Sequence, residues 1–405
     1  MSNTQKKNVP DLRFPGFEGE WEEKKLEDTL EFIKDGTHGT HENVNNGPWL
    51  LSAKNIKNNK IIISSDDRKI SESDYKKIYK NYKLEKGDLL LTIVGTIGRV
   101  AIVKNPNNIA FQRSVAILKT KATYDVEFIF QLFQTKYFKN LLLRKQVVSA
   151  QPGLYLGDIR KIKISITNII EEQRKIGIFF RKIDRQIELE EQKLELLQQQ
   201  KKGYMQKIFS QELRFKDENG KDYPEWIVKL IGDIGKVAMN KRIYKHETSA
   251  NEEIPFYKIG NFGKKADTFI SREQFNEYKE KYPYPKKGDI LISASGSIGK
   301  TIEYKGEEAY YQDSNIVWLD HNEEVLNVFL KYFYILVKWN GVEGTTIKRL
   351  YNKNILNTKI DLPTISEQQK IGNFFCYIDN LIEIQEQKLE FLKQRKQSLL
   401  QKMFV

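Results

Sequence analysis

The chain has 405 residues and a formal charge of +13, and it is rich in tyrosine and phenylalanine. This length allows two or three domains with their own cores, and a basic balance suits a polyanionic partner. The single cysteine, Cys376, excludes disulfide scaffolds and cysteine-based zinc sites. The N-terminal residues lack the apolar region of a signal peptide, and no run approaches the roughly 18 apolar residues of a membrane span. We therefore expect a cytoplasmic protein.

The first part of the chain has the signals of a small mixed domain. Residues 1–170 carry 28 Lys and Arg against 19 Asp and Glu, a net charge of +9. Short β-branched runs bounded by Gly, Asn, Asp or Pro predict strands at 61–63, 89–94, 100–103 and 115–118. Glycines predict turns at 87–88 and 95–98, and apolar periodicity predicts a helix over 126–143. This part is therefore expected to mix α and β around a strand-rich core.

Residues 171–209 predict one long helix. They contain no proline, and long unbranched residues such as Glu, Gln, Lys and Leu dominate them. At 1.5 Å per residue the helix would be about 57 Å long. Polar interruptions at Glu190 and Lys201 break an apolar heptad seam, which must be covered by a partner. The seam comprises Ile176, Phe180, Ile183, Ile187, Leu194, Leu197, Tyr204 and Ile208.

The partner of this helix is predicted within the same chain. Residues 367–404 repeat residues 172–209 without a gap, and roughly 22 of 38 positions are identical. Gln385 and Lys396 repeat the polar interruptions. In one antiparallel register Glu190 would face Lys396 and Lys201 would face Gln385, so each interruption would meet a complementary group. The second seam includes Ile371, Phe375, Ile378, Ile382, Leu389 and Leu392.

The repeat extends beyond the helices. Short matches recur in the same order in both halves: Leu12-Arg-Phe with Leu213-Arg-Phe, Lys86-Gly-Asp with Lys287-Gly-Asp, Gly95-x-x-Gly with Gly296-x-x-Gly, and Leu154-Tyr with Leu350-Tyr. A helix is predicted over 325–338. The stretches 36–46 and 240–253 align poorly, and loops on a rigid scaffold usually carry binding specificity. The predicted fold is α+β: two similar strand-rich domains (1–168 and 211–364) joined by two long antiparallel coiled-coil helices (169–210 and 365–405).

Catalytic and metal-binding patterns are weak. Residues 294–301 fit a loose P-loop and residues 316–320 resemble a Walker B strand, but the sequence after Thr301 reads as strand and turn. A P-loop needs a helix there to receive the phosphates. His38 and His41 lie three apart in a polar loop, which favours a solvated loop over a metal pair. A self-contained P-loop NTPase or nuclease remains the alternative to a non-catalytic binding protein.

Candidate DNA contacts are polar and basic residues of the predicted loops. Bases are read by Arg, Lys, Asn, Gln and Ser or Thr, and phosphates by Lys, Arg and backbone N–H groups. In the first domain the candidates are Lys34, Thr37, His38, Lys54, Asn55, Arg99, Gln112, Arg113, Ser114, Ser149 and Gln151. In the second they are Lys241, Arg242, Lys258, Asn261, Lys300, Gln312, Ser314, Asn315, Lys348 and Arg349. The segments 112–114 and 312–315 are the strongest, because they recur beside the glycine turns.

These motifs resemble the specificity subunit of type I restriction–modification systems. The Leu12-Arg-Phe-Pro-Gly-Phe-Glu-Gly-Glu-Trp opening, the glycine turns and the Glu171-Glu-Gln-Arg-Lys-Ile-Gly helix entry carry the resemblance. The Pro-Leu-Pro common before that entry is reduced to Asp361-Leu-Pro in the second copy and to Ser165-Ile-Thr in the first.

The resemblance implies a non-catalytic subunit with two target recognition domains. Each would read one half of a bipartite double-stranded DNA site, and the helices would fix the gap between the halves. It also implies two methyltransferase subunits and endonuclease/translocase subunits as partners. S-adenosylmethionine, ATP and Mg would then be bound by those partners and not by this chain.

Overall fold

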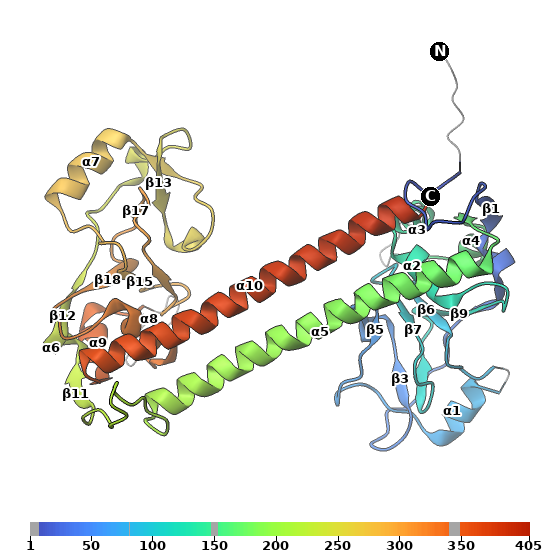
Figure 1. The fold of residues 1–405 in the computed structure, drawn as a ribbon, viewed down its shortest axis with the longest axis horizontal. Helices are drawn as coiled ribbons and strands as arrows, with labels where there is room; N and C mark the ends of the chain where they lie inside the picture. Colours follow the sequence, from blue (N-terminus) through green and yellow to red (C-terminus); the bar gives the residue numbers. More distant parts are fainter. Residues whose placement is uncertain (1–7, 81, 147–152, 340–348) are drawn as a thin grey trace, which may run out of the picture. The chain divides into compact units, whose positions relative to one another are not determined.

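The computed structural model describes residues 8–80, 82–146, 153–339 and 349–405, and it divides into two compact units. Unit 1 comprises residues up to 192 together with 387–405, and unit 2 comprises 193–386. Each unit contains one strand-rich domain and one half of each of the two long helices (Figure 1). The predicted α+β architecture, two domains joined by two long helices, is confirmed.

Domain 1 is built on a four-stranded antiparallel sheet with the order β2-β9-β6-β7. The strands are β2 (Leu30–Asp35), β6 (Leu89–Thr92), β7 (Val100–Ile102) and β9 (Val115–Thr120). Successive side chains of a strand point to opposite faces. Leu89 and Leu91 accordingly join the core that contains Trp21 and Phe128, whereas Leu90 joins a second core. Both faces of the sheet are therefore buried.

Shorter elements cover the two faces of this sheet. One helix was predicted over 126–143, but the structure has two, because Thr135 adopts an extended backbone and its hydroxyl accepts a hydrogen bond from Phe138 N. The other elements of domain 1 are β1 (Glu22–Lys25), η1 (Leu26–Thr29), β3 (Trp49–Leu51), η2 (Ala53–Asn55), β4 (Ile56–Lys57), β5 (Lys60–Ile61), α1 (Glu72–Ile78), β8 (Ile109–Phe111), α2 (Val126–Gln134), α3 (Lys136–Lys145), α4 (Leu156–Arg160) and β10 (Lys163–Ile166).

Domain 2 repeats this plan with the sheet order β12-β18-β15-β16. The strands are β12 (Gly235–Ala238), β15 (Ile290–Ser293), β16 (Thr301–Glu303) and β18 (Ile316–His321). Ile290 and Ile292 face one core and Leu291 faces another, as in domain 1. The remaining elements are β11 (Ile227–Leu230), α6 (Ile231–Ile234), η3 (Lys245–Glu247), β13 (Ile254–Tyr257), η4 (Ile259–Asn261), β14 (Phe269–Ile270), α7 (Arg272–Lys281), β17 (Tyr310–Tyr311), α8 (Asn327–Leu336), α9 (Asn352–Leu356) and β19 (Lys359–Leu362).

The long helices are α5 (Ile170–Phe209) and α10 (Ile365–Met403). In unit 1 they run antiparallel, because Asp184 pairs with Lys396 at 2.6 Å and Glu191 pairs with Lys393 at 2.8 Å. In unit 2 they also run antiparallel, because Lys201 pairs with Asp379 and Tyr204 packs against Phe374. The twelve seam residues Ile176, Phe180, Ile183, Ile187, Leu194, Leu197, Ile371, Phe375, Ile378, Ile382, Leu389 and Leu392 are all buried or half-buried. The predicted seam residue Tyr204 is instead 39% exposed, and its neighbour Met205 is buried.

The helix register differs from the predicted one. Lys396 binds Asp184, which precedes the predicted partner Glu190 by six residues. Lys201 binds Asp379, which precedes the predicted partner Gln385 by six residues. The prediction considered the two helices alone, whereas in the structure a third helix from each domain takes part. A polar seam residue is satisfied wherever suitable groups converge.

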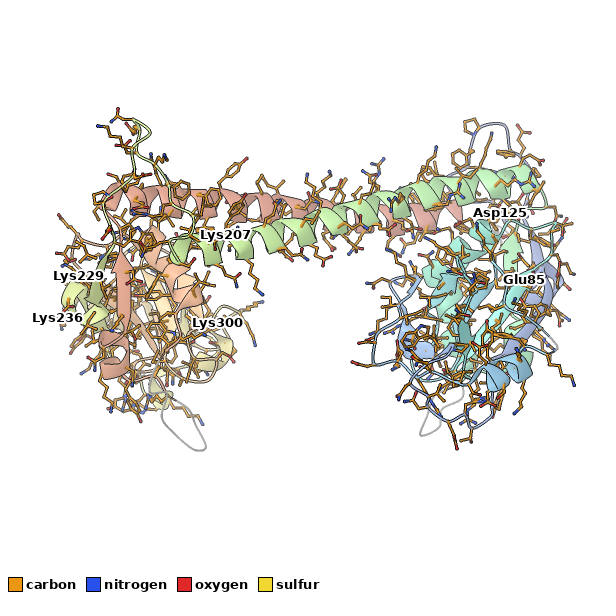
Figure 2. The ribbon with its side chains drawn as sticks, turned by 90° about the horizontal axis from the view of Figure 1, so that it is seen from below. Glu85, Asp125, Lys207, Lys229, Lys236 and Lys300 are labelled. Carbon is orange, nitrogen blue, oxygen red and sulfur yellow. The ribbon has the colours of Figure 1, made fainter. Side chains whose placement is uncertain are left out.

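The start of each long helix is anchored to its domain by a buried glutamate and glutamine. Glu172 accepts from Arg13 Nε at 2.6 Å and from Arg13 Nη2 at 2.9 Å, and Glu367 is bound in the same way by Arg214. The next residue, Gln173, accepts a hydrogen bond from Asp125 N at 2.9 Å. Asp125 lies in domain 1 beside the first turns of α5 (Figure 2). The repeated Glu-Gln entry motif therefore fastens helix to domain.

The ends of the long helices are also matched between the units. Phe209, at the end of α5, packs its ring against Trp226, Phe329 and Phe375 in unit 2. Phe404, just after α10, packs against Trp21, Phe128 and Phe180 in unit 1. The backbone connections agree as well, because Leu213 N donates to Lys207 O and Leu12 N donates to Lys402 O. After α5 the chain continues directly into domain 2. After α10 the same contacts are made with the start of domain 1, to which the end of α10 is not covalently joined.

Candidate nucleic-acid interface

The strongest predicted contact residues gather at one end of each central sheet, which we call the glycine-turn end. In domain 1 this end lies beyond Thr92, where the chain turns through two glycines with positive φ, Gly95 (78°) and Gly98 (84°), before β7. A positive φ suits glycine because it lacks a Cβ. Thr37 N donates to Phe111 O at 2.8 Å, and Arg113 N donates to Thr37 O at 3.0 Å. The ends of β2 and β9 are therefore joined beside the glycine turn.

The side chains at the glycine-turn end of domain 1 are open. Arg113 is exposed and Gln112 is half-buried, and neither side chain has a hydrogen-bond or ion-pair partner among the described residues. Ser114 Oγ instead supports the loop by accepting from Ala53 N at 3.0 Å. An unpaired guanidinium can bond a guanine bidentately, and a glutamine amide can do so with adenine. Domain 1 therefore presents, on a fixed backbone, two side chains of the kinds that pair with base edges.

The glycine-turn end of domain 2 is internally bonded. Arg242 Nε donates to Asp313 at 2.8 Å, and this carboxylate raises the pKa of Arg242. Gln312 Oε1 accepts from Ile259 N at 3.1 Å. Asn315 Oδ1 accepts from Ser295 at 2.7 Å and lies 3.4 Å from Arg349 Nη2. Its polar groups are therefore held in fixed directions.

One extra residue accounts for part of this difference. Val115 and Ile316 begin matched strands, but three residues separate Phe111 from Val115 and four separate Tyr311 from Ile316. Ser314 adopts φ 58°. A non-glycine residue in this left-handed region is uncommon, and such residues cluster at functional sites. The loop is thus re-shaped while the sheet beside it is preserved.

Other predicted contact residues take different places. Asn55 and Asn261 are buried, and their amides bind Asp67 and Asp267, which places both in the interior of their loops. The side-chain nitrogens of the basic candidates mostly contact their own domain: Lys34 the Tyr82 ring, Lys54 Asp67, Arg99 the carbonyl of Ile56, Lys241 the Tyr282 ring, Lys258 Thr268 and Lys300 the carbonyl of Phe262. Lys300 is labelled in Figure 2. Ser149, Gln151 and Lys348 lie outside the described residues.

The residues of the P-loop-like and histidine patterns lie in loops, turns and strands of their own domains. Lys300 is followed by strand β16, not by the helix that a P-loop requires. His38 lies against Asp35, and His41 lies between Thr37 and Asp74. Within the described ranges, no three His, Cys, Asp or Glu residues are grouped as a metal site would need.

Sequence reasoning missed two kinds of residue at these ends. Asp313 was included only as part of the segment 312–315 and not among the individual candidates, yet it orients Arg242. Tyr155 and Tyr351 are 67% and 44% exposed, respectively. Both follow the strand-like residues that bond to Ile93 and Ala294 beside the glycine turns. Their matched positions in the repeat could have identified them.

Comparison with known proteins places this architecture in a family. A model described as "Type I restriction modification DNA specificity domain" matches residues 18–199 and again residues 223–394. The chain therefore belongs to the type I restriction–modification specificity subunits, whose role is DNA target recognition. As predicted, it is a non-catalytic subunit and not a self-contained NTPase or nuclease.

Individual relatives agree with this assignment. The chain is 55% identical over 152 residues to a putative type I restriction enzyme specificity subunit of Haemophilus influenzae, a match covering 37% of this chain and 40% of that protein. It is 26% identical over 408 residues to the MjaIX specificity subunit of Methanocaldococcus jannaschii, covering 95% and 92%. The S subunit of M. genitalium shares the fold, with a TM-score of 0.61 at 16% identity over 98% and 99% of the two chains. Among the helices in the described part of the chain, none could span a bilayer.

Proposed function

We propose that this chain reads a bipartite DNA site, one half with each domain, and that the two long helices set the gap between the halves. The observation that carries the proposal is the pair of glycine-turn ends. They occupy the same place on the same scaffold but bear different polar groups. Two copies of one scaffold with different reading groups suit an asymmetric target with two unlike halves.

The geometry of B-DNA fits this arrangement. Two reading elements on one side of a duplex lie about one helical turn apart, roughly 34–36 Å. A continuous helix of 40 residues, such as α5, is about 60 Å long at 1.5 Å per residue. It is long enough to carry a domain at each end with a gap between the two half-sites.

The helices would also receive the methyltransferase subunits. Large apolar side chains remain exposed on them, although a helix facing only water would carry polar residues there. In unit 1 they include Ile178, Leu189 and Phe391, and in unit 2 Leu196, Tyr377 and Ile384. Tyr377, Ile384 and Phe391 are spaced by seven residues, so they recur on one side of α10.

Two methyltransferase subunits and the endonuclease/translocase subunits would complete the assembly, and they would bring S-adenosylmethionine, ATP and Mg. One solved structure similar in fold concerns complex assembly of the type I R-M system; it has a TM-score of 0.57 at 16% identity over 95% of this chain and 97% of the other. The chain itself would contribute recognition and assembly.

The test is to map methylated bases in a strain that carries this chain with its methyltransferase, together with Arg113→Ala and Arg242→Ala variants. The wild type should methylate a motif of two defined halves with an undefined gap. Arg113→Ala should relax the half read by domain 1, and Arg242→Ala the other half, each by about 1–3 kcal/mol at the contacted base. A single continuous motif, or both halves relaxing in each variant, would contradict the proposal.

A further inference from the structure

A buried polar network in unit 1 joins three helices. Lys396 of α10 is 4% exposed, and its Nζ donates to Asp184 Oδ1 of α5 at 2.6 Å and to Gln134 Oε1 of α2 at 2.7 Å. Gln131 of α2 donates to the other oxygen of Asp184 at 2.8 Å, and the amide of Gln134 donates to Gln131 at 3.1 Å. Both long helices and domain 1 therefore meet in one set of hydrogen bonds.

Unit 2 contains the repeat-matched counterpart. Lys201 of α5 pairs with Asp379 of α10, and Tyr332 of α8 donates to Asp379 Oδ2 at 2.7 Å. Lys201 and Lys396 are 195 residues apart, as are Asp184 and Asp379. In unit 1 the lysine is on α10 and the aspartate on α5, whereas in unit 2 the lysine is on α5 and the aspartate on α10. The third helix is α2 in unit 1 and α8 in unit 2. A lysine–aspartate pair fixed to the domain by a third side chain thus occurs in both units.

These pairs have geometric requirements that the apolar seam lacks. Burial lowers the pKa of Lys396, while Asp184 favours its charged form, so the ammonium depends on this partner. A buried charge pair is stable only in good geometry, whereas apolar seams tolerate sliding or rotation. The pairs Lys388–Glu190 and Lys393–Glu191 join the same helices but are more exposed, and exposed pairs contribute little.

We propose that the Lys396–Asp184 and Lys201–Asp379 pairs are positioning residues that fix the rotation of each domain about the helices, and thereby restrict the protein to one gap length. This inference rests on the proposed bipartite reading. In B-DNA one base pair corresponds to a rotation of roughly 34–36° and a rise of about 3.4 Å. A domain released to turn by that amount can reach a half-site displaced by one base pair.

Unit 2 offers the cleaner test. In unit 1, domain 1 has a further attachment to the long helices, because Lys60 pairs with Glu188 of α5 at 2.7 Å. Lys396 is also more deeply buried than Lys201, whose side chain is 20% exposed. We therefore expect replacement of Lys201 to damage folding less than replacement of Lys396. In the described part of unit 2, the third-helix side chain that bonds the pair is Tyr332.

The experiment uses the full chain assembled with its methyltransferase, and duplexes that carry the mapped site with its natural gap or with one base pair added or removed. Wild type should methylate the natural gap preferentially. Lys201→Met and Asp379→Asn should lower the preference for the natural gap by about tenfold or more, while methylome mapping shows unchanged half-sites. Lys201→Arg, which keeps a donor for Asp379, should restore most of the preference.

Lys393→Met is the matched control, because it removes a lysine from an exposed pair and should change gap preference by less than about twofold. If wild type itself has no gap preference, bipartite reading is wrong. If wild type is selective and the folded Lys201→Met and Asp379→Asn variants are equally selective, the positioning role is wrong. Thermal melting distinguishes the two roles, since a purely structural pair would lower the melting temperature and leave the gap preference intact.

Discussion

The two units fasten helix to domain through the same connections but complete them differently. In unit 1 the buried Glu172 is held by Arg13, and the indole nitrogen of Trp21 has no hydrogen-bond partner among the described residues. In unit 2 the buried Glu367 is held by Arg214 and also accepts from the Trp226 indole at 3.1 Å. The repeated ion pair is therefore the shared requirement, and the neighbouring polar groups can change.

The glycine-turn ends differ much more than these attachments do. Domain 1 leaves Gln112 and Arg113 open, whereas domain 2 holds Arg242 against Asp313 and Asn315 against Ser295. The polar side chains at the glycine-turn ends can therefore differ between the domains while the scaffold that carries them stays the same. Substitutions in the shared attachments should affect stability, and substitutions at the glycine-turn ends should affect the sequence that is read.

The largest expected effect is at the buried arginine–glutamate pairs. Arg13→Ala leaves Glu172 without its guanidinium and should destabilise unit 1 by roughly 3–5 kcal/mol. Arg214→Ala should cost about 1–2 kcal/mol less, because the Trp226 indole still donates to Glu367. Hydrogen exchange at the start of each long helix measures the two effects separately. The exposed Arg174→Ala is the control. An equal loss of stability from Arg13→Ala and Arg214→Ala would show that the Trp226 hydrogen bond does not compensate in unit 2.

The next effect is at the helix ends. Phe404 is 6% exposed, so Phe404→Ala should destabilise unit 1 by about 3–4 kcal/mol. Phe209→Ala should do the same in unit 2 or slightly less, because Phe209 is only half-buried. Denaturant unfolding followed by hydrogen exchange reports the losses. The exposed Phe391→Ala should have an effect within about 0.5 kcal/mol. A negligible effect of Phe404→Ala would show that the non-covalent junction is dispensable.

A smaller effect is expected at the helix glycines that touch the domains. A Cβ at Gly177 would lie 2.6 Å from Asp125 Oδ1 and 3.1 Å from Phe128 N, so Gly177→Ala should cost roughly 1–3 kcal/mol by displacing the start of α2. At Gly372 the three nearest atoms, at 2.5–2.9 Å, all belong to the Val328 side chain and none to the backbone, so Gly372→Ala should cost less. Gly203 has open space, and Gly203→Ala should stabilise by up to about 1 kcal/mol. Thermal melting compares the three, and the reverse order for Gly177 and Gly372 would contradict these contacts.

The smallest effect concerns the ion pair between Lys60 of domain 1 and Glu188 of α5. Hydrogen bonds from Lys60 and Arg185 lower the pKa of Glu188 from 4.5 to about 2. A carboxyl whose pKa is lower in the folded state stabilises above its unfolded pKa and loses that contribution as pH falls through the folded value. Glu188→Gln should therefore cost less than about 1 kcal/mol at pH 7, and the difference should vanish near pH 2. Denaturant unfolding across pH measures the difference in unfolding free energy between wild type and Glu188→Gln. A difference that grows in acid would contradict a stabilising Lys60–Glu188 pair.

Much of the scaffold could be predicted because its signals are periodic or repeated. The heptads of α5 and α10 and the matched glycine turns follow from local sequence. The break at Thr135 was missed because the flanking residues continue a helical apolar pattern, and only the hydroxyl cap on Phe138 N reveals it. The helix register was missed because Asp184 binds both Lys396 of α10 and Gln131 of α2. The prediction compared the two long helices alone and did not include α2.

The interface could be predicted in part. Repetition pointed to Gln112 and Gln312, and both lie at matched glycine-turn ends. Composition alone could not tell that Asn55 is buried while Arg113 is open, because this depends on which loop partners meet in three dimensions. The pairing of Arg242 with Asp313 spans 71 residues and has no local signature.

The proposed bipartite reading requires each domain to read its own half-site independently. Its most direct test is to replace residues 1–150 with the corresponding residues of another specificity subunit and to map the methylated sites of the assembled enzyme. The account predicts that one half of the motif changes, while the other half and the gap stay as they are. A change in both halves, or in the gap, would contradict it.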